Sequence, residues 1–300
     1  MKILLLGKNG QVGWELQRSL APLGELIALD RHSTEYCGDL SRLDDLANTV
    51  RSIQPDVIVN AAAYTAVDKA ESEPDLARTI NALAPEVLAR EAAQLGAWLV
   101  HYSTDYVFGG GGDQPWHEDD TTLPLNMYGQ TKLLGEHMID WMCPRHLIFR
   151  TSWVYASRGG NFAKTMLRLA QEREQLIVIN DQFGAPTGAE LIADVTAHAL
   201  RQVHLRDADI KALTGIYHLA AGGCTSWFDY AKHVLAQAPK VQPAIRIKAT
   251  EVKPVPTSAF PTPATRPLNS RLASHKLQAT FGLTLPDWQL GVNRMLAETL

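Results

Sequence analysis

The first half of the chain alternates short apolar runs with longer amphipathic stretches, and this alternation restricts the fold more than any other feature. The strand-like runs are Lys2–Leu6, Leu26–Leu29, Asp56–Val59, Trp98–Tyr102 and His146–Arg150. Helical patterns lie between them at Val12–Leu20, Leu43–Ile53 and roughly Asp75–Leu95. Strands that alternate with helices form βαβ units, in which helices cover both faces of a parallel sheet. The sequence therefore predicts an α/β fold with a doubly wound parallel sheet.

The second half has a different character. Strand-like runs occur at Leu176–Ile179 and Ile216–Leu219, and helical patterns at Phe162–Glu172, Ala189–Arg201, Trp227–Gln237, Ser270–Thr280 and Pro286–Leu300. Seven prolines fall between Pro239 and Pro267, which predicts an irregular extended segment there rather than a central strand or helix. We expect one domain over residues 1–155 and a smaller lobe over 156–300, with the strand near 216–219 a candidate to return to the first domain.

Composition excludes several classes of protein. The net charge is −4 and no run of Lys or Arg occurs, which argues against a general binder of nucleic acid or anionic membranes. No apolar stretch is long enough to span a bilayer. The three cysteines are scattered and form no CxxC pair, so we expect reduced thiols and a cytoplasmic location.

A glycine pattern follows the first predicted strand and opens the first predicted helix. Gly7, Gly10 and Gly13 are spaced three apart, a variant that is typical of the short-chain dehydrogenase/reductase superfamily. Glycines at this place permit a tight turn and allow the backbone and the helix N-terminus to approach a pyrophosphate. The alternative is a plain turn, but the strand–turn–helix context favours a dinucleotide site on a Rossmann-type sheet.

Two charged residues follow the second predicted strand, where the adenosine ribose of a dinucleotide would lie. A carboxylate such as Asp30 favours NAD, whereas an arginine such as Arg31 can hold the 2′-phosphate of NADP. Because both are present, the residues leave the choice between NADH and NADPH open. A solvated turn is the alternative for either residue.

The most informative set of residues combines a strand end with a helix. Ser103, Thr104 and Asp105 follow the strand Trp98–Tyr102, at the edge of the sheet where α/β folds bind ligands. Tyr128 and Lys132 are four residues apart on a predicted helix and so share a face. We expect the ammonium group to lower the pKa of the phenol, which would allow proton transfer near neutral pH.

Other candidates carry less weight. The ten histidines show no HxH or HExxH spacing and no GxSxG is present, so neither a catalytic zinc nor a serine nucleophile is supported. Glu118–Asp120 is interpreted as an exposed acidic loop. Glu190, Asp194 and His198 share one helix face, which is either solvated or lines an interface or a cation site.

These motifs together resemble the dTDP-4-dehydrorhamnose reductases, which are extended short-chain reductases that finish the synthesis of dTDP-L-rhamnose. The resemblance extends over nearly the whole chain and rests on Gly7–Gly13, Asn60–Asp68, Ser103–Phe108, Tyr128–Lys132, Arg150–Tyr155, Asp181–Thr187 and Arg266–Ser270.

The resemblance implies a role for each group of residues. The catalytic residues would be Thr104, Tyr128 and Lys132. The residues that bind NADPH or NADH would be Gly7, Asn9, Gly10, Gln11, Val12, Gly13, Asp30, Arg31, Asp39, Leu40, Ala62, Ala63, Thr65, Tyr128 and Lys132. The residues that bind the dTDP-sugar would be Val67, Asp68, Ser103, Thr104, Asp105, Trp153, Gln182, Thr187, Arg266 and Ser270. Some family members are dimers that contain Mg²⁺, so a homodimer and a Mg²⁺ ion are also implied, without identified ligands.

Three alternatives remain at this point. A dehydratase or epimerase could share the fold, but dehydratases commonly carry Thr-Asp-Glu where this chain has Tyr106 after Asp105. A reductase could act on another sugar nucleotide. A non-catalytic regulatory subunit is the third alternative, against which the intact set of Thr104, Tyr128 and Lys132 argues.

Overall fold

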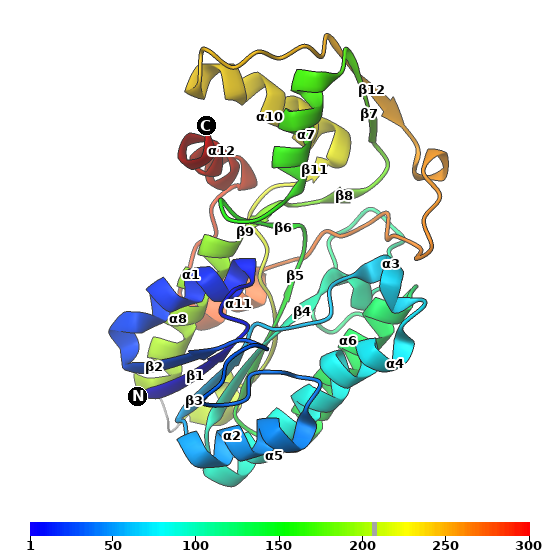
Figure 1. Cartoon of the computed structure of the whole chain (residues 1–300). Coiled ribbons are helices and arrows are strands. Elements are labelled where there is room, and N and C mark those ends of the chain that lie inside the picture. Colours follow the sequence, from blue (N-terminus) through cyan, green and yellow to red (C-terminus); the bar gives the residue numbers. More distant parts are fainter. Residues whose placement is uncertain (206–208) are drawn as a thin grey trace.

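A six-stranded parallel sheet forms the centre of the protein. The computed structural model describes residues 1–205 and 209–300. The strands are β1 (Lys2–Leu6), β2 (Glu25–Leu29), β3 (Val57–Asn60), β4 (Trp98–Thr104), β5 (His146–Thr151) and β10 (Gly215–His218). Their order is β2-β1-β3-β4-β5-β10, and Figure 1 shows them side by side in the lower part of the molecule. The chain leaves β1 toward β2 and returns on the other side at β3, and such a reversal is where doubly wound sheets bind ligands.

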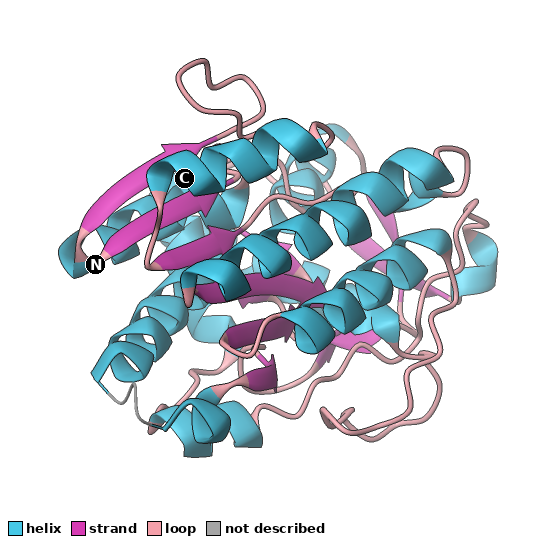
Figure 2. Ribbon diagram, turned by 90° about the horizontal axis from the view of Figure 1, so that it is seen from below, coloured by secondary structure: helices cyan, strands magenta, loops and turns pink. Residues whose placement is uncertain are grey.

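Helices cover both faces of this sheet, as Figure 2 shows from below. One face packs on α1 (Gln11–Leu20), α8 (Ala189–Leu205) and α11 (His275–Phe281), and the other on α2 (Leu43–Ile53), α5 (Ala84–Leu95) and α6 (Met127–Met142). Within β1, Ile3 and Leu5 belong to the first core, and Leu4 and Leu6 to the second. Because strand side chains alternate between faces, a strand buried on both sides is apolar throughout. The prediction of a Rossmann-type parallel sheet is confirmed.

A second lobe lies above the sheet in Figure 1. It contains α7 (Phe162–Glu172), α10 (Trp227–Val241), α12 (Trp288–Thr299) and the parallel pair of β7 (Gln175–Ile179) with β12 (Glu251–Val255). Two small strand pairs complete it, β6 (Val154–Tyr155) with β9 (Thr187–Gly188) and β8 (Phe183–Gly184) with β11 (Thr225–Ser226).

The chain passes between the lobe and the sheet several times. After β9 it returns through α8, α9 (Ile210–Leu213) and β10, which pairs with β5 in the central sheet. It then forms α10 and β12 in the lobe, comes back as α11, and ends in the lobe as α12. The predicted domain boundary near residue 155 remains a prediction. The sheet half and the lobe each contain segments that are distant from one another in the sequence.

The single helix predicted over Asp75–Leu95 is wrong in one detail. It is divided into α4 (Pro74–Arg78), a π-helical turn (Thr79–Leu83) and α5. Pro85 has no N–H to donate to the Asn81 carbonyl, so the regular ladder is interrupted there. Gly135 of α6 packs against this carbonyl, since a Cβ at Gly135 would lie 2.2 Å from Asn81 O. A proline and a contact from another helix thus set the local geometry.

Two predictions in the second half also need correction. The proline-rich stretch is not irregular throughout, because Pro239 lies in the final turn of α10 and Pro254 in β12. A strand in a two-stranded ladder has a free edge, which tolerates a residue without an N–H. The helix predicted from Ser270 begins only at His275. The backbone before it is extended instead, and Ser270 N and Ala273 N donate to Phe183 O and Trp116 O.

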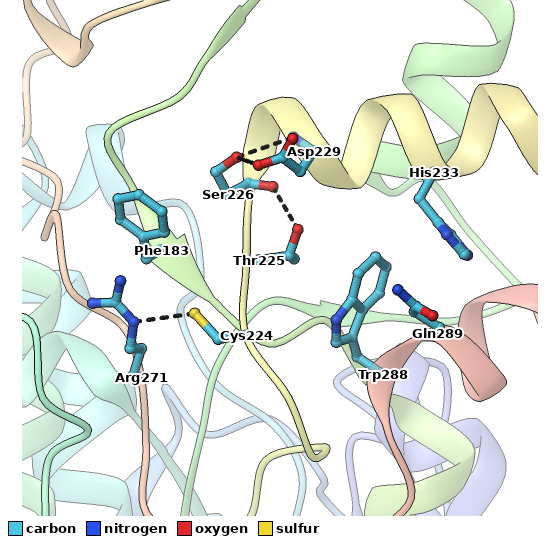
Figure 3. Close-up of a pocket in the computed structure, with 9 residues that line it drawn as sticks. All are labelled: Phe183, Cys224, Thr225, Ser226, Asp229, His233, Arg271, Trp288 and Gln289. Carbon is cyan, nitrogen blue, oxygen red and sulfur yellow. Dashed lines mark hydrogen bonds between the residues drawn. The ribbon is translucent and has the colours of Figure 1, made fainter.

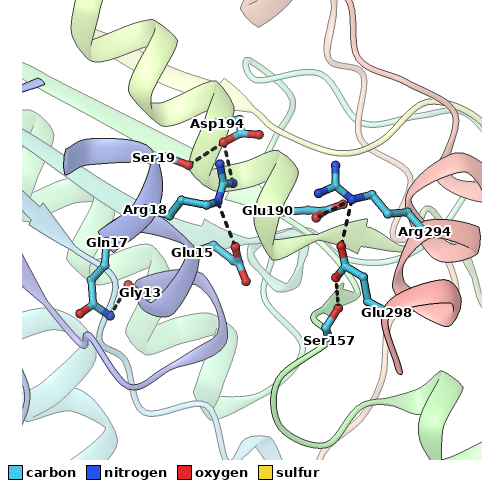
Figure 4. A network of polar contacts seen from close by, with 10 residues as sticks. All are labelled: Gly13, Glu15, Gln17, Arg18, Ser19, Ser157, Glu190, Asp194, Arg294 and Glu298. Carbon is cyan, nitrogen blue, oxygen red and sulfur yellow. Dashed lines mark hydrogen bonds and ion pairs between the residues drawn. The ribbon is translucent and has the colours of Figure 1, made fainter. Parts of the chain in front are cut away.

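A network of polar contacts joins α1, α8, α12 and the loop before α7 (Figure 4). Arg18 Nη2 lies 2.9 Å from Asp194 Oδ1, and Arg294 Nε lies 3.5 Å from Glu190 Oε2 and 3.1 Å from Glu298 Oε1. Glu190 and Asp194, for which a solvated face was one expectation, are therefore ion-paired. The Glu190–Arg294 pair connects α8 to α12, and exposed pairs of this kind contribute little each to stability.

Glu136 and Arg150 form the best-buried ion pair of the part of the chain that the structure describes. The Arg150 guanidinium donates to both Glu136 oxygens, at distances from 2.7 to 3.2 Å, and both side chains are nearly inaccessible. We expect Glu136→Gln to lower the free energy of unfolding by about 3–5 kcal/mol, because it leaves a buried guanidinium without its counter-charge. The measurement is a denaturant midpoint.

The control is Glu172→Gln, which removes an exposed partner of Arg168 on α7. It should cost less than about 1 kcal/mol. Equal effects of the two substitutions would contradict the account of the buried pair.

Candidate active site

The glycine turn after β1 is closed by direct backbone contacts. Gly7 has φ +88°, and a Cβ there would lie 2.8 Å from Ala61 C and from Ala62 N. A Cβ on Gly13 would lie 2.0 Å from Gly7 O, so α1 packs directly on the turn. Gly10 precedes the first residue of α1 and gives it no side-chain cap, which leaves helix N–H groups free to bind an anion. This cradle fits a dinucleotide pyrophosphate, and it unites the three predicted glycines.

The other predicted residues of the turn have partners within the protein. Asn9 Nδ2 donates to Asp30 Oδ2, and Gln11 Nε2 donates to Gly160 O at 3.0 Å. Val12 packs against the core on the α1 face. The side chain of Gln11 thus connects the start of α1 to the loop before α7.

The acidic side chain after β2 is held in place by its own turn. Asp30 Oδ1 accepts from the His32 N–H at 2.9 Å and from Ser33 Oγ at 3.2 Å. Burial alone would raise the pKa of Asp30, but these hydrogen bonds and nearby positive charges lower it below its usual value. Arg31 is exposed and its Nε lies 3.0 Å from His32 Nε2. A carboxylate and a guanidinium therefore both remain available at this edge.

The remaining residues that were predicted to contact the adenosine and the middle of the cofactor differ in their burial and hydrogen bonding. Asp39 Oδ1 accepts from the backbone and hydroxyl of Ser41. Leu40 is 4% exposed, so its side chain is part of the hydrophobic core. Ala62 and Ala63 are half-buried after β3, and Thr65 is exposed. Small residues at this strand end leave the backbone accessible beside the glycine turn.

Tyr128, Lys132 and Thr104 lie together at the carboxyl end of β4. Asn126 caps α6 by accepting the Gly129 N–H at 2.8 Å, which places Tyr128 in the first turn. Burial raises the pKa of Tyr128 to about 12, opposed by a hydrogen bond with the Thr104 side chain. The expectation that Lys132 lowers this pKa is corrected. Desolvation dominates, and the lysine amine is bonded elsewhere.

Lys132 is buried and faces β4. Its Nζ donates to Tyr102 O at 2.6 Å and lies 3.0 Å from His101 Nε2. Burial lowers the pKa of Lys132 to about 8, and the negative charge of Glu136 opposes this shift. The amine therefore titrates close to neutral pH.

Asp105 is a second titratable group in the site. It is 2% exposed, and Thr104 Oγ1 donates to its Oδ1 at 3.1 Å. Burial raises the pKa of Asp105 to about 6, while hydrogen bonds from Ser270 and Thr104 lower it. Ser103 is buried in the same strand end. The structure thus brings Ser103, Thr104, Asp105 and Ser270 together although Ser270 is distant in sequence.

Two predicted residues of the second lobe frame this site. The Trp153 ring stacks on Trp227 with centroids 3.6 Å apart, and Trp153 has an unusual φ of +50°. Gln182 accepts from Trp227 Nε1 at 3.1 Å and donates to Thr257 at 3.1 Å. Thr187 is fully buried with its hydroxyl bonded to Ala185 O and the Ala221 N–H, so its side chain is already occupied within the fold.

Arg266 and Asp68 join the segment before α11 to α3 (Val67–Ala70). Their side chains form an ion pair with a distance of 2.7 Å, and Asp68 also accepts from the Ala264 N–H. Val67, the first residue of α3, is half-buried beside Asp68. The guanidinium is thus held beside α3.

Sequence reasoning missed four polar residues around the site. Among the described residues, the buried hydroxyls of Thr151 and Ser152 have no hydrogen-bond partner, and both lie at the end of β5 beside β4. Asn60 and His101 are buried polar residues on β3 and β4. Asn60, Thr151 and Ser152 stand at strand ends that were visible in the sequence, whereas the contact of His101 with Lys132 of α6 joins residues that are distant in sequence.

A pocket elsewhere in the lobe has different lining residues (Figure 3). It is lined by Phe183, Cys224, Thr225, Ser226, Asp229, His233, Arg271, Trp288 and Gln289. A Cβ at Gly184 would contact Trp153 and Ser270, so the neighbouring Phe183 side chain points to the other side of β8. Phe183 and this pocket therefore lie on the opposite side of β8 from Trp153 and Ser270.

The Mg²⁺ ion implied by the resemblance has no support here. Within residues 1–205 and 209–300, no group of three or more His, Cys, Asp or Glu side chains is arranged to hold a metal ion. In the same residues, no helix is both long and apolar enough to cross a bilayer.

The fold and site define a class of protein. A doubly wound sheet with a glycine turn after β1, and a Tyr–Lys pair beside a threonine at the end of β4, characterise an NAD(P)-dependent oxidoreductase of the short-chain type. The family model described as "RmlD substrate binding domain" matches residues 1–300. The chain belongs to this family. Several of its relatives are named dTDP-4-dehydrorhamnose reductase.

Individual relatives support this assignment. The chain is 63% identical over 298 residues to a dTDP-4-dehydrorhamnose reductase of Escherichia coli K12, covering 99% of this chain and 98% of the relative. It is similar to a crystal structure of such a reductase from Bacillus anthracis in complex with NADP, with 34% identity, full coverage of both chains and a TM-score of 0.86. A UDP-glucose 4-epimerase from Thermus thermophilus, 20% identical with a TM-score of 0.77 and covering 100% of this chain and 99% of its own, shares the fold.

The raised pKa of Asp105 makes stability depend on pH. Above about pH 6 the carboxyl is ionised in both the folded and unfolded states, and the folded state bears the cost of burial. A shift from 3.8 to about 6 corresponds to about 3 kcal/mol, a cost that shrinks as pH falls from 6 toward 3.8 because the folded carboxyl then takes up its proton, and that vanishes below this range where both states are protonated. We expect Asp105→Asn to increase the free energy of unfolding by up to this amount at pH 7, and by much less at pH 4.

Denaturant unfolding at both pH values measures the effect. Asp119→Asn, at an exposed carboxylate, is the matched control and should change little at either pH. An Asp105→Asn protein that is less stable than the wild type at pH 7 would show that the carboxylate is stabilising.

Proposed function

We propose that this protein reduces the 4-keto group of dTDP-4-dehydro-L-rhamnose to give dTDP-L-rhamnose, with NADPH or NADH as the hydride donor and Tyr128 as the proton donor. The observation that supports this most is the grouping of Tyr128, Thr104 and Lys132 at the carboxyl end of β4, in a chain 63% identical to a reductase of that name. The alternative is a reductase of another sugar nucleotide, and identification of the product separates the two.

The nicotinamide supplies the hydride when it is bound, and the protein supplies orientation and the proton. With a pKa near 12, the Tyr128 phenol keeps its proton at neutral pH. An alkoxide that forms at the keto carbon is a stronger base than a phenolate, so the proton moves from Tyr128 to the new hydroxyl. Thr104 donates a hydrogen bond to the same oxygen in this proposal. Lys132 binds the nicotinamide ribose.

The second lobe binds the nucleotide part of the substrate in this proposal. Trp153 packs on the sugar, Gln182 and Ser270 contact the dTDP group, and Arg266 approaches its diphosphate. The ion pair with Asp68 holds the guanidinium beside α3, where a diphosphate would compete for it. Binding energy from this remote group would orient the carbonyl for reaction.

The resemblance also leads us to propose a homodimer that works in the cytoplasm. Support for the location comes from Cys37, Cys143 and Cys224, which are free thiols. Size-exclusion chromatography with light scattering checks the oligomeric state.

The Tyr128 hydroxyl is the central element of this mechanism. We expect Tyr128→Phe to bind NADPH almost normally but to lose on the order of 10²–10⁴ in turnover, the usual share of general acid catalysis. Tyr106→Phe is the matched control, because its ring lies edge-on to Tyr128 with centroids 5.5 Å apart. It should retain turnover within a few-fold. Near-native turnover of Tyr128→Phe would rule out this donor.

Cofactor preference follows from Arg31 and Asp30. We expect the wild type to use both NADPH and NADH. Arg31→Ala should weaken NADPH relative to NADH by about 1–3 kcal/mol, the range for a charge-assisted hydrogen bond to a phosphate. The ratio of kcat/KM values for the two cofactors measures this, and an unchanged ratio would show that Arg31 does not contact the 2′-phosphate.

A further inference from the structure

A chain of buried polar groups connects Lys132 to the backbone beside the glycine turn. Lys132 Nζ lies 3.0 Å from His101 Nε2, and His101 Nδ1 lies 3.1 Å from Asn60 Nδ2. Asn60 Oδ1 accepts the Ala62 N–H at 3.2 Å. The three side chains come from α6, β4 and β3, and each is 1% exposed. Water therefore does not satisfy these groups, and their protons must be arranged among themselves.

The amide orientation of Asn60 follows from chemistry. A backbone N–H can only donate, so the atom that faces Ala62 N must be the amide oxygen. The amide nitrogen then faces His101 Nδ1 and donates to it. His101 Nδ1 is consequently unprotonated, and a neutral ring must carry its proton on Nε2, which faces Lys132.

Two arrangements of the protons satisfy the hydrogen bonds among Lys132, His101 and Asn60. In the first, His101 Nε2–H donates to Lys132, whose Nζ must then be a neutral amine with a free lone pair. In the second, Lys132 is an ammonium that donates to His101 Nε2, so His101 carries its proton on Nδ1 and the Asn60 amide turns over to accept it. The second arrangement places the Asn60 nitrogen against the Ala62 N–H, which then needs another acceptor.

The Ala62 N–H lies where such an acceptor would be found. A Cβ on Gly7 would be 2.8 Å from Ala62 N, so this N–H adjoins the turn that binds a pyrophosphate in the proposed function. It also follows β3, at the point where the strand order reverses. A cofactor oxygen that accepts the Ala62 N–H would therefore favour the ammonium form of Lys132.

We propose that His101 is a positioning residue for Lys132, and that its tautomer links the protonation of Lys132 to the acceptor of the Ala62 N–H. The Tyr102 carbonyl and the His101 ring hold two positions around Nζ, so a remaining N–H is directed away from β4. This inference rests on the proposed function only for the catalytic role of Lys132. The link between the His101 tautomer and the protonation of Lys132 is a property of the buried polar groups themselves.

Few other charges act on this amine. Glu136 lies one turn further along α6 and is bonded to Arg150 of β5. Tyr128 lies one turn earlier on α6, and Asp105 follows β4. His101 itself remains neutral, since burial and the nearby Lys132 lower its pKa well below the usual value. A change of its tautomer near the pKa of Lys132 is therefore not a titration of the imidazole.

Nitrogen-15 NMR of histidine-labelled protein tests the linkage directly, because the two ring nitrogens of each tautomer differ strongly in chemical shift. On passing from below to above about pH 8, the pKa of Lys132, we expect the His101 proton to move from Nδ1 to Nε2. Two internal references are available. His146 Nδ1 faces Cys143 O and His218 Nδ1 faces Trp116 O, so both should be neutral Nδ1–H tautomers on both sides of pH 8.

Substitutions make the result decisive. Lys132→Met should abolish the pH-dependent tautomer change of His101. Binding of NADPH should raise the pH at the midpoint of this change in the wild type, and should raise it less in Asn60→Ala. A single His101 tautomer on both sides of pH 8, or a change that persists in Lys132→Met, overturns the proposal. An NADPH shift that is equal in Asn60→Ala overturns the connection to Ala62.

Steady-state kinetics separates positioning from folding. His101→Leu removes the acceptor, and we expect kcat to fall on the order of 10-fold to 100-fold with little change in KM for the sugar nucleotide. His101→Gln offers an amide oxygen to Lys132 and should restore most of the rate. Wild-type kcat in His101→Leu overturns the positioning role. Wild-type kcat in Lys132→Met contradicts the proposed function instead, and leaves the tautomer result standing.

Discussion

The close contact of three backbone segments at the end of β1 is the constraint on which the rest of the structure depends. Gly7, Gly13 and Ala61 approach so nearly that a methyl group at either glycine would meet backbone atoms. This contact fixes the start of α1 and the exit of β3 relative to the sheet. It also brings the Ala62 N–H beside the turn. A change here would alter the cofactor cradle and the core at once.

Local patterns in the sequence predict the sheet, the glycine turn and the helix that carries Tyr128 and Lys132, because strand burial and helix spacing leave a periodic record. Other features depend on contacts between distant residues. The π-helical turn at Thr79–Leu83 arises from Pro85 together with Gly135, and the backbone from Ser270 is extended because it pairs with Phe183 and Trp116. The direction of the Tyr128 pKa shift was mistaken because spacing showed the lysine but not the burial.

The site contains buried ionisable groups whose charged forms do not stabilise the fold. Asp105 and Lys132 are both buried, and burial shifts the pKa of each toward its neutral form. Behind them, Arg150 and Glu136 compensate each other. Buried polar groups with these properties are typical of functional sites, where stability is given up for a defined arrangement of protons.

The repeated passage of the chain between sheet and lobe has a consequence for synthesis on the ribosome. The edge strand β10 and the covering helix α11 are made after the first lobe elements, and α11 ends only at Phe281. The core between the sheet and α1, α8 and α11 is therefore incomplete until Phe281 has been made, whereas the core on the other face needs buried residues only up to Ile148. The apolar face of the sheet that these late elements cover stays exposed during synthesis for longer than the face that α2, α5 and α6 cover.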